Sequence, residues 1–206
     1  LFLDFSKAFD SVWHTALLLS LSANGVSPWL TNLLQSYLCD RSFTVLFEGC
    51  FSSPRLAETG VPQGSHLGPL LFDIFIADLP RLHKVTPWAY ADDLAFTSVT
   101  NDAPLRMQRM LDAVTEWAHQ KKLRLNVPKC AILKTGRQVP VRLVTQGQVI
   151  PQTNRFLYLG VPVTPYLRSS AIIAHRVGKL RQLIPWARQM RRYVSSPQMA
   201  MQLLKT

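Results

Sequence analysis

The sequence predicts an α+β fold, and three observations lead to this expectation. Short apolar or alternating runs typical of strands are interspersed with longer stretches of helical periodicity. These helices and strands do not alternate regularly, as they would around a parallel sheet. The chain has 206 residues, of which 48% are hydrophobic and 17% charged, so it can bury a substantial core.

The first 80 residues are expected to contain two short strand regions and three helices. The run LFLDF has the length and apolarity of a buried strand, with Asp4 near its end. Ser27-Pro28 is a typical helix start, and Asp10 and Ser65 are expected to cap the helices that follow them. The expected elements are a strand at 1–5, helices at 12–23 and 27–38, a hairpin of 42–49 with 55–58, and a helix at 69–79.

The second half begins with TPWAYADDLAFTSV, which is expected to form two strands joined tightly at Asp92-Asp93. The helix after it has the clearest pattern, since Asp102 can cap it and Pro104 falls in its first turn. Its apolar stripe is Met107, Met110, Leu111, Val114, Trp117 and Ala118. The remaining expected elements are strands at 131–134, 141–144 and 156–160 and a basic amphipathic helix at 168–193, broken near Pro185.

The charge of the chain is uneven along the sequence. The net charge is +11, yet all 12 acidic residues lie at or before Glu116. Seven basic residues accompany them, and 16 basic residues follow, so the two parts carry −5 and +16. A basic stretch without internal counter-charges indicates an anionic partner, usually nucleic-acid phosphate. A generic basic surface is the alternative, and an anionic membrane fits less well because the basic residues are spread among strands and turns.

The cysteines and histidines do not indicate a disulfide framework or a zinc site. The three cysteines are far apart without a C-x-x-C pair, which fits a reducing compartment, and the five histidines are scattered. No signal peptide or 18-residue apolar run is present, so no membrane segment is expected. Because Leu1 already lies inside an apolar run, we expect the sequence to be an excerpt of a longer protein.

Two adjacent carboxylates, Asp92 and Asp93, stand inside the apolar stretch AYADDLAF. Successive side chains of a strand point to opposite faces, so these two can converge only at a turn. On the pair alone, an ordinary structural turn is the favoured interpretation. Two divalent cations about 3.5–4 Å apart would instead make several carboxylates tolerable together. Asp4, at the end of a buried strand, could supply the third carboxylate, and Phe5 a backbone carbonyl.

Five short motifs occur in order along the chain. They are LDFSKAFD (3–10), GVPQGS (60–65), YADD (90–93), LNVPKC (125–130) and FLYLGV (156–161). Together they resemble the successive palm motifs of a reverse transcriptase, and FSKAFDSVWH is similar to LINE-type retrotransposons, which lack long terminal repeats. The resemblance covers nearly the whole chain. It implies an RNA-directed DNA polymerase, a nucleotidyltransferase whose palm is an antiparallel sheet backed by helices.

The resemblance implies roles for the three aspartates. In reverse transcriptases the matching residues hold two magnesium ions, for which manganese can substitute. One ion would activate the primer 3′-hydroxyl to attack the α-phosphate, and the other would stabilise the leaving pyrophosphate. Asp4 and Asp92 are expected to bridge the ions, Phe5 to add its carbonyl, and Asp93 to be a supporting ligand or hydrogen-bonding group.

The resemblance also implies a nucleotide site. Phe9 matches the family's aromatic steric gate, which rejects a 2′-hydroxyl by close packing; an ordinary core phenylalanine is the alternative. Gln63 and Gly64 match the loop beneath the templating base and incoming nucleotide, with a plain helix-entry loop as the alternative. Lys129 matches a lysine proposed to protonate the departing pyrophosphate, with phosphate binding as the alternative.

Residues nearer the end of the sequence are expected to contact nucleic acid. FLYLGV resembles the primer-grip hairpin, in which Tyr158 and Gly160 would brace the primer end, with a core role as the alternative for Tyr158. The basic helix after it resembles the start of the thumb and has an apolar stripe of Val177, Leu180, Ile184 and Ala187. Its side chains available for phosphates are Arg176, Lys179, Arg188, Arg191 and Arg192.

These assignments imply two domains and a set of partners. Residues 1–165 would form a palm with part of the fingers inserted at about 12–59, and 166–206 would begin the thumb. The partners would be an RNA template, a DNA primer, target DNA, dNTPs and the element's own RNA in a ribonucleoprotein, with no membrane. The protein would be intracellular, working in the nucleus at its target site or in a cytoplasmic ribonucleoprotein.

Other functions compete with this interpretation. A group II intron maturase shares these motifs, and a decayed or domesticated copy would bind nucleic acid without catalysis. A viral RNA polymerase would usually carry Gly-Asp-Asp and lack the aromatic gate, and a purely structural module leaves the charge asymmetry unexplained. Because the upstream fingers and most of the thumb are not among these residues, we expect the stretch alone to be inactive.

Overall fold

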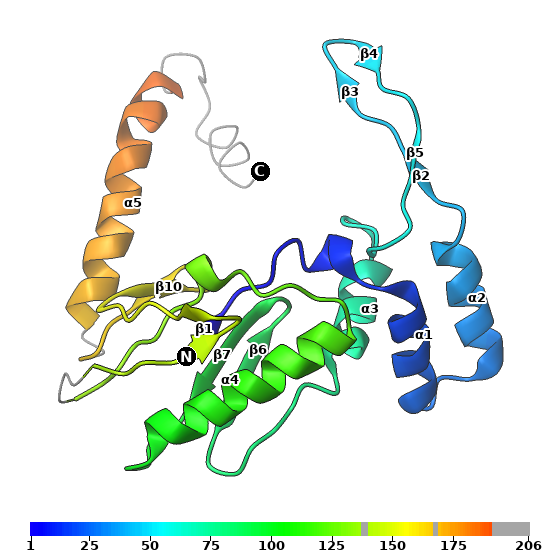
Figure 1. Ribbon diagram of the computed structural model, residues 1–206. Helices are drawn as coiled ribbons and strands as arrows, with labels where there is room; N and C mark the ends of the chain where they lie inside the picture. Colours follow the sequence, from blue (N-terminus) through cyan, green and yellow to red (C-terminus); the bar gives the residue numbers. More distant parts are fainter. Residues whose placement is uncertain (137–139, 167–168, 191–206) are drawn as a thin grey trace. The chain divides into compact units, whose positions relative to one another are not determined.

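The computed structural model describes residues 1–136, 140–166 and 169–190, which form a mixed fold of helices and small antiparallel sheets (Figure 1). The α+β class predicted from the sequence is therefore confirmed. The chain divides into two compact units, Leu1–Ile132 with Val139–Thr153 and Leu133–Gln138 with Asn154–Thr206. The palm and thumb were expected to meet near residue 165 instead, and that assignment stays a prediction.

A three-stranded antiparallel sheet with the order β1-β7-β6 lies at the centre of the first unit. β1 (Phe2–Leu3) pairs with β7 (Asp93–Thr97), which pairs in turn with β6 (Thr86–Tyr90). The β6–β7 hairpin turns at Ala91 and Asp92, one residue earlier than expected, so Asp93 is already the first residue of β7. The three central residues of β7 are buried, which explains its apolar sequence.

Four helices contribute buried side chains to the same hydrophobic core as the sheet. The stripe predicted on the longest of them is confirmed, because all six of its residues are buried. The others were expected within two or three residues of their observed bounds. The helices are α1 (His14–Ala23), α2 (Pro28–Leu38), α3 (Leu67–Ile76) and α4 (Ala103–Gln120).

Two of the predicted helix caps are confirmed. The hydroxyl of Ser27 accepts a hydrogen bond from the Leu30 N–H at the start of α2. The hydroxyl of Ser65 accepts from the Gly68 N–H at 2.9 Å and so satisfies a donor in the first turn of α3, although His66 occupies the N-cap position of that helix.

The other two predicted caps are wrong. Asp10 lies in a short 3-10 helix, whereas α1 begins only at His14, so the carboxylate of Asp10 is too early to cap α1. Asp102 does occupy the N-cap position of α4, but its side chain makes no capping hydrogen bond. It pairs instead with Arg106 at 2.8 Å, because a charged guanidinium is a stronger donor than a backbone amide.

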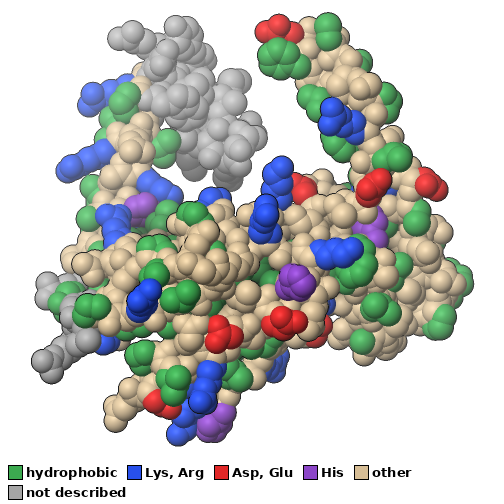
Figure 2. Space-filling model, viewed as in Figure 1, with side chains coloured by type: hydrophobic (Ala, Val, Ile, Leu, Met, Phe, Trp, Pro, Cys, Tyr) green, Lys and Arg blue, Asp and Glu red, His purple; other side chains and the backbone are tan. Residues whose placement is uncertain are grey.

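A two-stranded arm connects α2 to α3, and Figure 1 shows it leading away from these helices. The expected hairpin is confirmed, but the strand expected over 42–49 is interrupted, because Glu48 and Gly49 form a turn with positive φ. Phe43, Phe47 and Phe51 are each more than half exposed, and Figure 2 shows hydrophobic side chains along the arm. β2 (Ser42–Phe43) pairs with β5 (Arg55–Leu56), and β3 (Leu46–Phe47) pairs with β4 (Cys50–Phe51).

The strands expected at 131–134 and 141–144 do not form as predicted. Ala131 bridges to Phe2, whereas Ile132 bridges to Gln152. Because neighbouring residues use different partners, no continuous ladder develops along this stretch. Farther on, β8 (Val144–Thr145) pairs with β9 (Gln148–Val149) in a small hairpin.

The second unit contains a tight hairpin followed by a long helix. β10 (Phe156–Tyr158) and β11 (Val161–Val163) are joined by Leu159 and Gly160, whose φ values of +48° and +74° suit a two-residue turn. α5 (Ser169–Met190) continues through Pro185, so the expected break is wrong. A proline removes one hydrogen bond of the helix, and here this loss does not end it.

Two expectations about the environment of the chain can be compared with the fold. All three cysteines are free thiols, as expected. Among the described residues, no helix combines the length and the apolarity needed to cross a bilayer.

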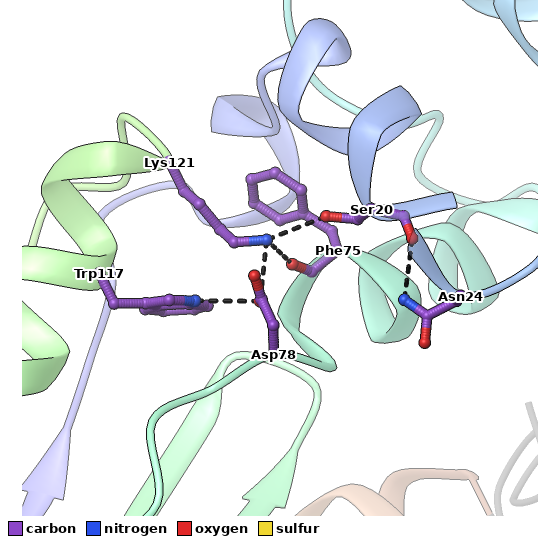
Figure 3. A network of polar contacts seen from close by, with 6 residues as sticks. All are labelled: Ser20, Asn24, Phe75, Asp78, Trp117 and Lys121. Atoms are coloured by element: carbon purple, nitrogen blue, oxygen red, sulfur yellow. Dashed lines mark hydrogen bonds and ion pairs between the residues drawn. The ribbon is translucent and has the colours of Figure 1, made fainter. Parts of the chain in front are cut away.

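Lys121, directly after α4, is buried in the first unit and was not singled out from the sequence. Its ammonium lies 2.6 Å from the Phe75 carbonyl, 3.0 Å from the Ser20 hydroxyl and 2.9 Å from an Asp78 carboxylate oxygen (Figure 3). Each of the three N–H groups of the ammonium can therefore donate to one of these three oxygens. The Trp117 indole also donates to Asp78, at 3.0 Å. This network joins α1, the end of α3 and the end of α4.

We expect Lys121→Ala to lower the free energy of unfolding by about 2–4 kcal/mol, because buried acceptors on α1 and α3 would lose their donor. Urea unfolding followed by circular dichroism measures this change. Arg109→Ala, at an exposed position on α4, is the matched control and should change stability by less than about 0.5 kcal/mol. Equal losses in the two variants would contradict a special role for the buried lysine.

Candidate active site

The antiparallel register of the central sheet brings the first aspartate to the hairpin that carries the other two. Leu3 pairs with Leu94, so the next position along the chain, Asp4, falls opposite Asp93. Asp92 lies in the turn just before Asp93 and lines the same cleft as Asp4. The acid at the end of the first strand therefore lies at the hairpin that carries the acidic pair.

This cleft has a volume of about 450 Å³ and is open to solvent. Residues from four of the five motifs meet in it, since the segment 4–9, the loop before α3, the β6–β7 turn and Lys129 all contribute to its walls. Asp93 is not among its lining residues. The predicted site residues that line it are Asp4, Phe5, Phe9, Gln63, Gly64, Asp92 and Lys129.

The carboxylates in and beside the cleft repel one another. Burial raises the pKa of Asp93 above its ordinary value, and the negative charges of Asp92 and Asp4 raise it further. The Oδ2 atom of Asp4 is buried and has no hydrogen-bond partner among the described residues. The Lys129 ammonium lies 3.9 Å from this atom, too far for a hydrogen bond, and the lysine side chain is largely exposed. An unpaired buried carboxylate oxygen favours a cation as its partner.

The aspartates and the Phe5 carbonyl offer oxygen atoms, which suit divalent cations as ligands. Carboxylate and carbonyl oxygens are the ligands that magnesium prefers. Phe5 bridges to Leu125 through two hydrogen bonds, from the Asn126 N–H to the Asp4 carbonyl and from the Ser6 N–H to the Arg124 carbonyl. The Phe5 carbonyl is not used by this bridge. Within the described parts of the chain, no group of three or more acidic, histidine or cysteine side chains is arranged to hold a metal ion, so the fit is one of ligand chemistry alone.

Phe9 stands on the wall of the cleft, against a buried aromatic ring. Its ring stacks on Phe72 of α3, with 4.3 Å between centroids and an interplanar angle of 15°. Phe72 is fully buried, whereas Phe9 is half-buried. Phe9 is thus neither an ordinary core residue nor a free surface side chain, because one part of it packs on the core and another borders the cleft.

Gln63 and Gly64 belong to the loop that enters α3, and both are exposed at the cleft. The Gln63 amide nitrogen donates to a carboxylate oxygen of Asp10 at 2.8 Å. The sequence analysis assigned Asp10 to a helix cap and did not connect it with Gln63. Nothing in the spacing of the two residues, 53 positions apart, indicates this contact.

The predicted residues of the primer grip and thumb belong to the second unit. Gly160 lies in the β10–β11 turn and Tyr158 at the end of β10. Arg176 and Lys179 lie on α5, whereas Arg191, Arg192 and the Ala187 side chain fall outside what the structure describes. The stripe residues Val177, Leu180 and Ile184 are exposed rather than buried.

A group of basic side chains surrounds His175 on α5. Burial lowers the pKa of His175, and the positive charges of Lys179, Arg155 and Arg176 lower it further. Arg155 and His175 were not selected from the sequence, although both lie in the stretch without acidic residues. The effect of these three charges on His175 indicates that basic side chains gather around this part of α5.

Comparison with known proteins decides the family. Residues 1–163 match the family described as "Reverse transcriptase (RNA-dependent DNA polymerase)". The chain belongs to the reverse transcriptase family. This match covers the central sheet, the cleft and the β10–β11 hairpin of the reverse transcriptase chain.

Several curated relatives of this reverse transcriptase chain come from mobile elements of flies. "RNA-directed DNA polymerase from mobile element jockey" of Drosophila funebris is 38% identical over 174 residues, 78% of this chain and 19% of the relative. "Probable RNA-directed DNA polymerase from transposon BS" of Drosophila melanogaster is 33% identical over 205 residues, 89% of this chain and 22% of the relative. "Probable RNA-directed DNA polymerase from transposon X-element" of the same species is 35% identical over 173 residues, 78% of this chain and 19% of the relative.

The chain thus spans about a fifth of the length of these curated relatives. The similarity to LINE-type elements lacking long terminal repeats, recognised from the motifs, is confirmed by these matches.

We expect magnesium to raise the melting temperature of the wild type more than that of Asp93→Asn, because bound cations relieve the repulsion that raises the pKa of Asp93. A raised pKa means that the Asp93 carboxylate opposes folding at higher pH and that this opposition disappears as pH falls through the pKa. The magnesium effect should therefore shrink on acidification. Differential scanning fluorimetry with and without magnesium measures both trends.

Asp73→Asn removes an exposed acid of α3 outside the cleft and is the control for this measurement. It should keep the full magnesium effect. An equal magnesium shift in Asp93→Asn and the wild type would argue against cation binding at the three aspartates.

Proposed function

We propose that this chain is the catalytic core of an RNA-directed DNA polymerase from a retrotransposon without long terminal repeats. It would transfer a nucleotide from a dNTP to a primer 3′-hydroxyl, with two magnesium ions, or manganese in their place, as cofactors. Residues 1–165 would be the palm with part of the fingers, and the residues from 166 the start of the thumb. Membership in the reverse transcriptase family supports this reaction.

One observation carries the proposal most directly. The β1–β7 register sets Asp4 opposite Asp93, and Asp4 and Asp92 line one cleft with Phe9, Gln63 and Lys129. Carboxylates that can hold metal ions and a cation that can reach a phosphate, both at one open cleft, are the groups that nucleotidyl transfer uses. The core of a purely structural module would have no reason to keep the Asp4 oxygen buried without a hydrogen bond.

The three aspartates and the Phe5 carbonyl would supply the oxygens that hold the metal ions. When bound, magnesium lowers the pKa of the primer hydroxyl and neutralises charge on the phosphates. Asp4 and Asp92 face the cleft and are proposed as the bridging ligands, with Asp93 in support. The raised pKa of Asp93 supports this, because a nearby cation would offset the burial and the negative charges that disfavour its carboxylate.

The reaction forms one bond and breaks another at the α-phosphorus. The primer 3′-oxygen loses its proton to solvent as it bonds to this phosphorus, and the bond to the pyrophosphate oxygen breaks in line with it. Lys129 is proposed to donate a proton to the departing pyrophosphate. Its exposed ammonium near Asp4 leaves it close to the metal ligands and free to reach a phosphate.

The incoming nucleotide would lie against Phe9 and the Gln63-Gly64 loop. Phe72 stacks behind the Phe9 ring, so the ring is backed by the core and cannot easily retreat from a 2′-hydroxyl. Gly64 has no side chain and a φ of +81°, which lets the loop backbone approach a ligand closely.

The basic second unit would bind the sugar–phosphate backbone of template and primer. Tyr158 and Gly160 of the β10–β11 hairpin would act at the primer end, and Arg176, Lys179, Arg191 and Arg192 at phosphates. The charges of Lys179, Arg155 and Arg176 around His175 support an anionic ligand here. Such contacts would be independent of base sequence and sensitive to salt.

The natural partners we propose are the element's RNA as template and ribonucleoprotein component, target DNA that supplies the primer, and dNTPs. Synthesis at a target site implies work in the nucleus, with no part played by a membrane. The names of the curated relatives, each an RNA-directed DNA polymerase of a mobile element, support this over a group II intron maturase.

Asp92→Asn should lower primer extension in the complete natural protein by at least about a hundredfold, because a bridging carboxylate would be lost. Binding of the RNA template should change little, since Asp92 lies away from the basic unit in the sequence and carries no positive charge. Extension of a labelled primer on RNA and DNA templates with magnesium, with template binding by fluorescence anisotropy, measures both effects.

A decayed copy that only binds nucleic acid makes the opposite prediction. Wild type and Asp92→Asn would then bind template equally well, and neither would extend the primer. If the wild type extends the primer and Asp92→Asn does so at the same rate, the assignment of Asp92 is wrong.

Phe9→Ala should increase ribonucleotide incorporation relative to deoxyribonucleotide incorporation by about tenfold or more, because space for a 2′-hydroxyl would open in front of Phe72. Competition between rNTPs and dNTPs in single-nucleotide extension measures the ratio. Phe9→Tyr keeps the ring and is the control, so its selectivity should stay close to that of the wild type. Unchanged selectivity in Phe9→Ala would remove the gate role.

A further inference from the structure

The segment 9–14 is bound to the loop 59–63 by hydrogen bonds that bridge about 50 residues of sequence. Two of them are between backbone groups. The Val61 N–H donates to the Phe9 carbonyl at 2.9 Å, and the Gly60 N–H donates to the Val12 carbonyl at 2.8 Å. We call this pair of segments the 9–14/59–63 junction. It holds the nucleotide-side loop directly against the residues that follow the Phe9 gate.

Side chains from both segments add two further contacts to the junction. His14 Nε2 lies 2.8 Å from the Gly60 carbonyl, and the Thr59 hydroxyl donates to the Asp10 carbonyl at 2.9 Å. The approach is so close that a Cβ on Gly60 would lie 2.9 Å from the Asp10 Cα, and Gly60 has a φ of +90°. Only glycine fits at this position without a shift of the backbone.

The remaining contact of the junction has a direction that chemistry fixes. The Gln63 Nε2 donates to an Asp10 carboxylate oxygen at 2.8 Å. A carboxylate offers acceptors only, so the amide nitrogen of Gln63 must face Asp10. The opposite end of the amide, the Oε1 acceptor, is thereby turned away from Asp10 while Gln63 lines the cleft.

Neither fold stability nor metal binding accounts for this contact. Asp10 and Gln63 are both exposed, and hydrogen bonds between exposed side chains contribute little to folding. Asp10 does not line the cleft in which Asp4 and Asp92 lie. The contact therefore defines the orientation of a side chain at the nucleotide site.

We propose that Asp10 is a positioning residue, which holds the Gln63 amide so that its Oε1 accepts a hydrogen bond from a donor group of the incoming nucleotide. This inference rests on the proposed polymerase function. Without Asp10, the Gln63 amide rotates and presents donor or acceptor without preference. Part of the binding energy for the nucleotide is then spent on ordering the side chain.

Asp10→Ala, made in the complete natural protein, tests the inference by steady-state single-nucleotide extension. The KM for the dNTP should rise about tenfold, while kcat changes less than about twofold, because a contact made equally in the bound and transition states is lost. Asp10→Asn keeps an acceptor oxygen for the Gln63 amide, so it should restore most of the dNTP affinity. If Asp10 had only a structural role, its loss would not raise KM while leaving kcat unchanged, and Asp10→Asn would not restore the dNTP affinity.

Thr59→Val is the matched control, because it removes a hydrogen bond of the same junction without touching the Asp10–Gln63 contact. It should leave the KM for the dNTP within about twofold of the wild type. In a double-mutant comparison, Asp10→Ala combined with Gln63→Ala should be no worse than Gln63→Ala alone, since Asp10 acts through Gln63.

The outcomes separate this inference from the proposed function. The positioning role alone would be overturned by one set of results. In it, the wild type extends the primer, Asp92→Asn is inactive, and the KM of Asp10→Ala for the dNTP is unchanged. A wild type that does not extend a primer would overturn the polymerase function and the inference with it. If thermal unfolding shows that Asp10→Ala does not fold, Asp10→Leu, whose side chain branches at the same carbon as aspartate but carries no acceptor, gives the same test.

Discussion

The pairing of β1 with β7 is the interaction on which the cleft depends. It brings Asp4 opposite Asp93 and so forces like charges together, which the raised pKa of Asp93 reflects. The sheet resists this repulsion because Leu3 and Leu94, the pair next to the carboxylates, are buried in the core. Hydrophobic burial thus holds in place an arrangement that electrostatics alone would push apart, and cations are the natural means of relieving it.

The core also fixes the wall of the cleft through α3. The Lys121 ammonium binds the Phe75 carbonyl of this helix, and Phe75 neighbours Phe72 in the core. Phe72 in turn stacks on Phe9. A continuous set of packed groups therefore runs from a buried, fully bonded ammonium to the ring that borders the cleft. A side chain with no part in the chemistry can in this way determine how firmly Phe9 is held.

The sequence predicted most elements because local patterns determine them. The stripe of α4, the β6–β7 hairpin and the helix starts at Ser27 and Ser65 depend on periodicity and on hydrogen bonds within a few residues. The contacts that it did not predict join distant positions. Asp10 meets Gln63 across 53 residues and Lys121 meets Ser20 across 101, and neither contact leaves a trace in local spacing. Motif order identified most of the residues that line the cleft, whereas contacts such as the one between Asp10 and Gln63 became visible only in the fold.

The arm between α2 and α3 ends where the 9–14/59–63 junction begins. Its strands pair with one another, and a ribbon of two short strands opens readily in water. The hydrogen bonds of Thr59, Gly60 and Val61 clamp the returning chain just before it reaches the cleft. Local opening, cleavage or a change of length in the arm is therefore not transmitted past these hydrogen bonds to the cleft. The arm can thus change in sequence or length while the geometry of the neighbouring cleft stays constant.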